Sequence, residues 1–222
     1  MKKTFKIALD GPSGSGKSTI AKKLSEKLDI LYLDTGAMYR ATALKALKLN
    51  VDTFDEKGVS KFIGDLDLDI KYENGSQQTY LDGENVSGKI REPQVSMAAS
   101  NISSLKCVRL KMVEMQRKIA ASTSCVLDGR DIGSFVLPDA DYKFYITASV
   151  DVRAKRRFKE LAEKGFNVDF EKLKKEIEER DYNDSHREFA PLIKADDAIL
   201  IDTSDMSIDE VINAVMSHIN NR

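Results

Sequence analysis

Residues Gly11 to Ser18 have the types and the spacing of a loop that holds phosphate. They fit the pattern GxxxxGK[ST] in full, after a short apolar run and before an amphipathic stretch, which is the context that this pattern requires. Glycines allow the backbone to wrap closely round phosphate oxygens, and a helix that starts there adds the positive end of its dipole. Lys17 can then reach the β- and γ-phosphates, and the Ser18 hydroxyl can ligate Mg²⁺. We therefore predict a nucleoside triphosphate site formed by Gly11, Pro12, Ser13, Gly14, Ser15, Gly16, Lys17, Ser18 and Thr19.

Arginines and carboxylates follow two other predicted strands. The segment Asp34–Arg40 comes after one of them, and Asp128–Asp131 comes after the other. Ligands of open α/β sheets bind at the carboxyl ends of the strands, and arginine forks match the geometry of phosphate. We therefore expect a second, phosphate-bearing substrate beside the phosphate loop. The chain has no NKxD-type segment, which a GTPase would use to read its base.

The stretch from 151 to 187 is dense in charge and predicts two helices that are broken at Gly165. Arg180, Asp184 and Arg187 have i, i+4, i+7 spacing and would share one helix face. That face is either a run of surface ion pairs or part of a ligand site. Before these residues comes a group of three arginines, Arg153, Arg156 and Arg157. The group is either a solvated helix face or part of a lid over a triphosphate. As residues that bind the triphosphate we predict Arg153 and Arg157.

Short apolar strands alternate with amphipathic helices along most of the chain, which is typical of a parallel α/β sheet. Ser207 and Glu210 have capping-box spacing before a closing helix. The pattern predicts an α/β fold with a three-layer core of the P-loop NTPase type and a central parallel sheet. Its expected strands are 6–9, 30–33, 125–127, 143–146 and 198–201, and the first helices are 18–28 and 38–47.

One region departs from this rhythm. Apolar and charged residues alternate strictly over 66–72, and a second strand-like run contains Tyr80 and Leu81. An apolar residue at every second position, with one solvent-exposed face, is typical of antiparallel strands. Tight-turn dipeptides flank the second run, Asn74-Gly75 and Asp82-Gly83. We therefore predict that residues 63–100 form a small antiparallel insert in the parallel core.

The composition limits the classes of function. The net charge of −1 over 222 residues provides no general basic field, so we expect no nucleic-acid partner. No apolar run approaches the ~20 residues of a membrane span, and no signal peptide is evident. The two cysteines match no metal pattern and are expected to be reduced thiols. We expect a cytoplasmic protein without membrane contact, and nothing indicates more than a monomer.

Taken together, these segments resemble the bacterial cytidylate kinases over essentially the whole chain. The resemblance implies a short helical lid at about 152–167, a nucleoside-monophosphate-binding insert at 63–100 and a P-loop kinase core at 1–62 and 101–222. The segments that carry it are Asp10–Ser18, Leu33–Arg40, Gly83–Ser87 with Ile90-Arg91, Asp128–Asp131 and Glu179–Leu192.

Roles can be carried over by position from that family. The resemblance implies that Arg40, Arg130 and Arg187 hold the acceptor phosphate. Cytosine would be read by Ser100, Arg109 and Asp131, and the ribose would face Arg180 and Asp184. Asp34 would arrange the site near the phosphates, so that the catalytic set is Lys17, Asp34, Arg130 and Arg187. Thr35 stands where serine is common in the family, and it offers the same hydroxyl.

The reaction implied is transfer of the γ-phosphoryl group of ATP, with Mg²⁺, to CMP or dCMP, giving CDP or dCDP and ADP. A carboxylate at Asp131 can accept a hydrogen bond from the cytosine amine and would repel the oxygen of uracil. Two alternatives stay open: a P-loop kinase of another small acceptor (UMP, dTMP or shikimate), and a nucleotide-binding regulatory or nucleic-acid-associated ATPase. The sequence does not separate CMP from dCMP.

Overall fold

The computed structural model describes residues 4–73, 75–163 and 165–220. The chain forms two compact units. One consists of Met1–Tyr32 with Thr123–Arg222, and the other is Leu33–Ser122. The second unit includes the predicted insert at 63–100 together with the helices on either side of it. The functional boundaries of the insert and of the lid stay predictions.

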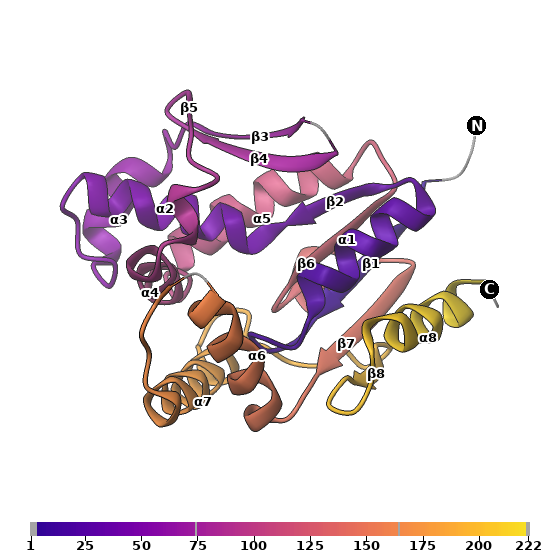
Figure 1. Ribbon diagram of the computed structural model, residues 1–222. Coiled ribbons are helices and arrows are strands. Elements are labelled where there is room, and N and C mark those ends of the chain that lie inside the picture. Colours follow the sequence, from indigo (N-terminus) through magenta and orange to yellow (C-terminus); the bar gives the residue numbers. More distant parts are fainter. Residues whose placement is uncertain (1–3, 74, 164, 221–222) are drawn as a thin grey trace. The chain divides into compact units, whose positions relative to one another are not determined.

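A five-stranded parallel sheet carries the first unit, as the alternating pattern predicted (Figure 1). In register, Ile7 lies opposite Val126 on one side of β1 and opposite Tyr142 on the other. The central strand is therefore the one that runs directly into the phosphate loop. In spatial order the strands are β2 (Leu31–Asp34), β6 (Cys125–Gly129), β1 (Lys6–Asp10), β7 (Tyr142–Thr147) and β8 (Ile199–Asp202).

Two helices contribute buried apolar residues to the core of this sheet, and Figure 1 shows both helices. They are α1 (Lys17–Leu28) and α8 (Ile208–Asn220). Their buried residues share one cluster with the strands, and at ~25 cal/mol per Å² of apolar surface such burial supplies most of the stabilisation. The predicted capping box starts α8, since Glu210 accepts hydrogen bonds from the backbone and the hydroxyl of Ser207. The cluster is Ile7, Leu9, Ile20, Ala21, Leu24, Val126, Phe144, Ile146, Ile201, Val211, Ile212 and Val215.

The charge-dense stretch forms the two predicted helices, α6 (Val150–Glu163) and α7 (Phe170–His186). They pack on each other through a small apolar cluster that includes Ala154 and Leu173. Gly165 has φ +81 in the connection, a conformation that glycine adopts without strain. The predicted helix face of Arg180, Asp184 and Arg187 is one residue too long. α7 ends at His186, and the backbone of Arg187 is extended.

The second unit combines helices with a small sheet. The strands β3 (Leu68–Glu73), β4 (Ser76–Leu81) and β5 (Glu84–Asn85) are antiparallel, as predicted. Asp82 and Gly83 both have positive φ in the tight turn between β4 and β5, whereas Asn74 of the other turn lies outside the described residues. The helices are α2 (Thr35–Lys48), α3 (Glu56–Ile63), α4 (Pro93–Ile102) and α5 (Lys106–Ala120), and a 3-10 turn spans η1 (Lys89–Arg91).

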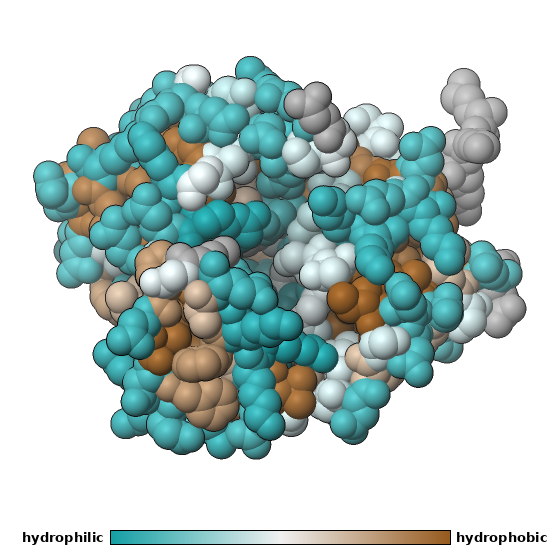
Figure 2. Space-filling view, viewed as in Figure 1, coloured by the Kyte–Doolittle hydropathy of each residue, from teal (hydrophilic) through white to brown (hydrophobic). Residues whose placement is uncertain are grey.

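The face shown in Figure 2 is mostly polar. Hydrophilic residues cover most of the visible face in Figure 2, and the apolar ones stand in separate small groups. In the part of the chain that the structure describes, no helix is both long and apolar enough to cross a membrane.

Candidate active site

The phosphate loop joins β1 to α1 in the first unit. Gly11, Gly14 and Gly16 have φ of +143, +78 and +94, which L side chains rarely adopt. A Cβ atom built on Gly11 would lie 2.0 Å from the carbonyl oxygen of Ile146 on β7. The loop can therefore pass close to the neighbouring strand only because glycine stands at that position.

The ammonium group of Lys17 is buried within this loop. It donates to the carbonyl oxygen of Pro12 at 2.6 Å and to the hydroxyl of Ser15 at 3.2 Å. Burial, and then the charge of Arg130, hold the pKa of Lys17 well below its usual value. A bound polyphosphate would favour the ammonium form, because opposite charge raises the pKa of a lysine.

Asp128 opens the predicted site segment Asp128–Asp131, but sequence reasoning assigned it no role of its own. It lies near the end of β6, and its carboxylate accepts a hydrogen bond from the Ser18 hydroxyl at 2.7 Å and from the Tyr32 hydroxyl at 3.1 Å. A serine hydroxyl beside a carboxylate fits the way proteins hold Mg²⁺, with one or two oxygen groups while substrate phosphates and water complete the shell. The missing information was that β6 is the neighbour of β1, which is a property of the sheet and not of any local pattern.

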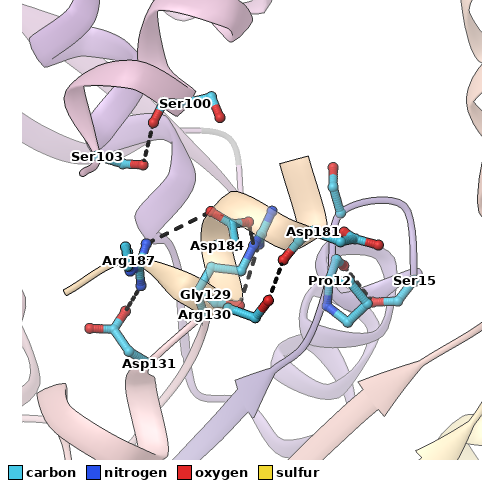
Figure 3. A network of polar contacts seen from close by, with 12 residues as sticks. Pro12, Ser15, Ser100, Ser103, Gly129, Arg130, Asp131, Asp181, Asp184 and Arg187 are labelled. Carbon is cyan, nitrogen blue, oxygen red and sulfur yellow. Dashed lines mark hydrogen bonds and ion pairs between the residues drawn. The ribbon is translucent and has the colours of Figure 1, made fainter. Parts of the chain in front are cut away.

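Arg130, Asp131, Asp184 and Arg187 form one network of charges (Figure 3). The Nε of Arg130 donates to Asp184 at 2.9 Å. Arg187 lies 3.8 Å from the other oxygen of Asp184 and 3.7 Å from Asp131. Burial would raise the pKa of Asp184, but the guanidinium groups of Arg130, Arg180 and Arg187 outweigh it and hold the pKa low. Four of the predicted residues in this unit thus converge, and the charge of Arg180 acts on Asp184 as well.

The two predicted lid arginines lie in different surroundings. Arg153 is buried, and it donates to the Ser13 carbonyl of the phosphate loop at 3.1 Å and to the Ala148 carbonyl at 2.9 Å, and it also bonds Asp181 on α7. Arg157 is closer to the surface and pairs with Glu160 at 2.8 Å. Arg153 therefore holds the backbone of the phosphate loop, whereas contact of either arginine with a triphosphate stays a prediction.

Asp10, the last residue of β1, is a second residue that the sequence did not reveal. Its two buried oxygens accept hydrogen bonds from the backbone N–H groups of Ile132 and Gly133, both at 2.7 Å. Burial raises the pKa of Asp10 to about 7, although these two hydrogen bonds work in the opposite direction. The bonds fix the start of a short π-helical segment, η2 (Ile132–Val136), which directly follows Arg130 and Asp131.

In the second unit, Asp34 is the centre of the predicted acceptor residues. Its Oδ1 accepts from the backbone of Ala37 at 2.9 Å and so caps α2. Its Oδ2 accepts from Arg40 at 3.3 Å and from Arg91 at 2.8 Å. Burial would raise the pKa of Asp34, but these two arginines outweigh it and lower the pKa. Thr35 is buried as the first residue of α2.

Ser100 and Arg109 are also brought together in this unit. The hydroxyl of Ser103 donates to the carbonyl of Ser100 at 2.8 Å (Figure 3), and Arg109 donates to the carbonyl of Ser103 at 3.1 Å. Arg109 is almost fully buried, and its guanidinium lies over the ring of Tyr39 at 5.5 Å. The predicted site residues therefore form two sets, one in each unit.

These two sets can now be compared with known proteins. A family model described as cytidylate kinase matches residues 7–221. The chain belongs to the cytidylate kinase family. A cytidylate kinase of Caldicellulosiruptor bescii is 49% identical over 214 residues, which cover 96% of this chain and 95% of that protein. A cytidylate kinase of Clostridioides difficile is 51% identical over 214 residues, with 96% and 97% covered.

Solved structures bear out the fold of this family member. A protein from Eubacterium ventriosum superposes with a TM-score of 0.57 at 17% identity, covering 99% of this chain and 100% of that one. A shikimate kinase from Bacteroides thetaiotaomicron superposes with a TM-score of 0.51 at 12% identity, covering 97% and 98%. At such identities the likeness concerns the fold alone, which is the predicted α/β core.

Proposed function

We propose that this chain transfers the γ-phosphoryl group of ATP to CMP or dCMP and releases ADP with CDP or dCDP. Membership of the cytidylate kinase family implies ATP as the phosphate donor. The observation that supports the reaction best is the convergence of Arg130, Asp184, Arg187 and Asp131 in the unit that carries the phosphate loop. A loop alone would hold a triphosphate, whereas a second buried set of arginines suits a second phosphate.

The donor phosphates would lie in the loop from Gly11 to Ser18. The loop N–H groups and Lys17 would neutralise the charge that develops on the transferred group. Among the described residues, no cluster of three or more His, Cys, Asp or Glu side chains could hold a metal ion by itself. Ser18 and Asp128, 2.7 Å apart, are the residues that would hold Mg²⁺ together with the phosphates. When bound, Mg²⁺ would neutralise phosphate oxygens and orient them for in-line transfer.

The acceptor phosphate would be held by Arg40, Arg130 and Arg187. Transfer is direct, because positioning and charge compensation are sufficient for phosphoryl transfer and no nucleophilic residue is needed. The ion pairs that these arginines make with Asp34 and Asp184 fix their geometry before a substrate arrives, and prearranged charges stabilise a transition state without reorganisation.

Base and sugar recognition would fall to the remaining residues. Asp131 would accept from the exocyclic amine of cytosine, and Ser100 and Arg109 would serve its acceptor atoms. Arg180 and Asp184 would face the ribose. A buried carboxylate opposite the oxygen of uracil would be unpaired, and such a mismatch discriminates far more strongly than shape does.

We also propose the arrangement in which these parts work. The insert at 63–100 would bind the monophosphate, and a lid at about 152–167 would close over the triphosphate and exclude water. The chain would act as a monomer without a nucleic-acid partner. Both cysteines are free thiols, which suits the reducing cytoplasm.

The test is release of ADP, measured in a coupled assay with CMP, dCMP, UMP, AMP, shikimate or RNA as the added acceptor. We expect rapid release with CMP and dCMP and a value of kcat/KM at least about 100-fold lower with UMP. A higher kcat/KM with UMP or shikimate than with CMP would contradict CMP as the acceptor and identify the preferred compound instead. Release that no small acceptor stimulates would support a regulatory ATPase instead.

A further inference from the structure

Asp34 is held by the insert at its backbone as well as at its carboxylate. The side-chain amide of Gln77 on β4 makes both backbone contacts: its oxygen accepts from the Asp34 N–H at 2.8 Å, and its nitrogen donates to the Asp34 carbonyl at 3.3 Å. One amide that serves the donor and the acceptor of one residue replaces a pair of ladder hydrogen bonds. Since β2 is an edge strand of its sheet, these are groups that no neighbouring strand would otherwise satisfy.

The second contact comes from the 3-10 turn of the same insert. Arg91 donates to Oδ2 of Asp34 at 2.8 Å, and Arg40 donates to the same oxygen at 3.3 Å. The Asp34 side chain is 7% exposed, whereas that of Arg91 is 54% exposed. A buried carboxylate is thus shared between an arginine from α2 and an arginine that the insert supplies.

Sharing changes what Arg40 can do. A carboxylate that pairs with one arginine neutralises it, whereas two arginines and one carboxylate keep one positive charge. The second arginine therefore makes the electrostatic potential around Asp34 more favourable for an anion such as a nucleotide phosphate. The shorter contact to Arg91 leaves the donors of Arg40 less engaged with Asp34, and a phosphate can compete for them.

We infer that Gln77 and Arg91 are positioning residues of the acceptor site: the insert holds Asp34 at its backbone and its carboxylate, and so keeps Arg40 available to the acceptor phosphate. Gln77 fixes Asp34, the residue that caps α2, and therefore the direction in which α2 presents Arg40 six residues further along the chain. Arg91 takes up part of the charge of Asp34. The inference rests on the proposed function, because it concerns how the same acceptor is held.

The variants are chosen with matched controls from the same elements. Arg91→Gln removes the positive charge. Arg91→Lys keeps the charge but lacks the planar, forked donors of a guanidinium group. The control is Lys89→Gln. Lys89 lies two positions before Arg91 on the same turn, and its ammonium group pairs with Glu84 rather than with Asp34. Gln77→Leu removes the amide, and its control is Gln78→Leu, whose amide bonds Ser76 and Asn85 rather than Asp34.

The measurements are KM for CMP, KM for ATP, kcat and the thermal midpoint of the full chain. We expect Arg91→Gln and Gln77→Leu to raise KM for CMP about tenfold while KM for ATP changes less than about twofold. Arg91→Lys should recover part of the loss, and both controls should match the wild type. Equal rises in both KM values, or equal effects in the controls, would overturn the inference.

A double-mutant cycle with Asp34→Asn provides a readout that a purely structural role would not move. If Arg91 acts through the carboxylate of Asp34, Arg91→Gln should have little further effect on KM for CMP in the Asp34→Asn background. Additive effects would contradict action through Asp34. Failure of the wild type to use CMP would instead overturn the proposed function, so the two failures can be told apart.

Discussion

Two buried aspartates end two strands of the same sheet, and the protein treats them in opposite ways. Asp10 and Asp34 are equally buried, at 5% exposure. Asp10 accepts from two backbone N–H groups and has its pKa raised to about 7 by burial. Asp34 accepts from two arginines, and its pKa is lowered in spite of burial.

The difference shows how much compensation a buried carboxylate requires. Two backbone dipoles at 2.7 Å do not balance the loss of hydration at Asp10, whereas two full charges do so at Asp34. Asp34 is therefore a permanent anion that orients cations. Asp10 holds a loop and can gain or lose a proton near neutral pH.

The largest effect on activity should come from Lys17, whose charge in the phosphate loop acts on Asp10. Lys17→Ala removes the buried ammonium, and we expect kcat to fall about 1000-fold because a preorganised charge on the transferred group is lost. Steady-state assays with CMP and ATP measure it, and circular dichroism should show an intact fold. Turnover like that of the wild type would contradict the role of Lys17.

Replacing each aspartate in turn tests the comparison directly. Asp34→Asn removes the buried carboxylate that pairs with Arg40 and Arg91, and because Arg91 is half-exposed we expect the free energy of unfolding to fall by about 2–3 kcal/mol. Asp10→Asn keeps one acceptor oxygen but places an amide N–H against a backbone donor, and we expect a smaller loss of about 1–2 kcal/mol. Urea unfolding at pH 7 measures both losses of stability, and a larger loss in Asp10→Asn than in Asp34→Asn would contradict the comparison.

The pH dependence of stability should have opposite signs for the two residues. Between pH 4 and 7 unfolded Asp10 loses its proton while the folded form keeps it, so Asp10 makes stability decrease as pH rises, by about 2 kcal/mol from pH 5 to 7. The lowered pKa of Asp34 contributes stability above pH ~4 that is lost on acidification. Unfolding curves of each Asn variant, subtracted from the wild type, should show these two trends, and parallel trends would contradict them.

The smallest effect should be on selectivity in the acceptor. Asp131→Ala removes the carboxylate that is proposed to accept from cytosine, so we expect the ratio of kcat/KM for CMP over UMP to narrow about tenfold. Asp139→Ala is a control in the loop before β7, outside the network. An unchanged ratio in Asp131→Ala would reject base reading by this residue.

The parts that the sequence predicted well are those set by local pattern. The phosphate loop, the five strands, the break at Gly165 and the alternation in β3 each depend on residues that are close along the chain. The family resemblance then supplied roles for residues such as Arg40 and Asp184, which spacing alone left as either ion pairs or ligand contacts.

The parts that sequence could not provide depend on contacts between distant residues. Asp128 meets Ser18 across 110 positions, and Asp10 meets Gly133 across 123 positions. Gln77 and Arg91 have ordinary polar types in an insert, and nothing in their neighbours indicates that both reach Asp34. Arg153 lies on a helix that reads as solvated, but backbone carbonyls and Asp181 satisfy its guanidinium in the interior.

The raised pKa of Asp10 has a consequence for the energetics of nucleotide binding. A carboxyl group with a pKa of about 7 is partly protonated at neutral pH. Polyphosphate entering the adjacent loop would bring negative charge close to it and raise that pKa further. Donor binding would then draw a proton from the medium, so that the heat of binding would depend on the ionisation enthalpy of the buffer and the affinity for ATP would decrease as the solution becomes more alkaline.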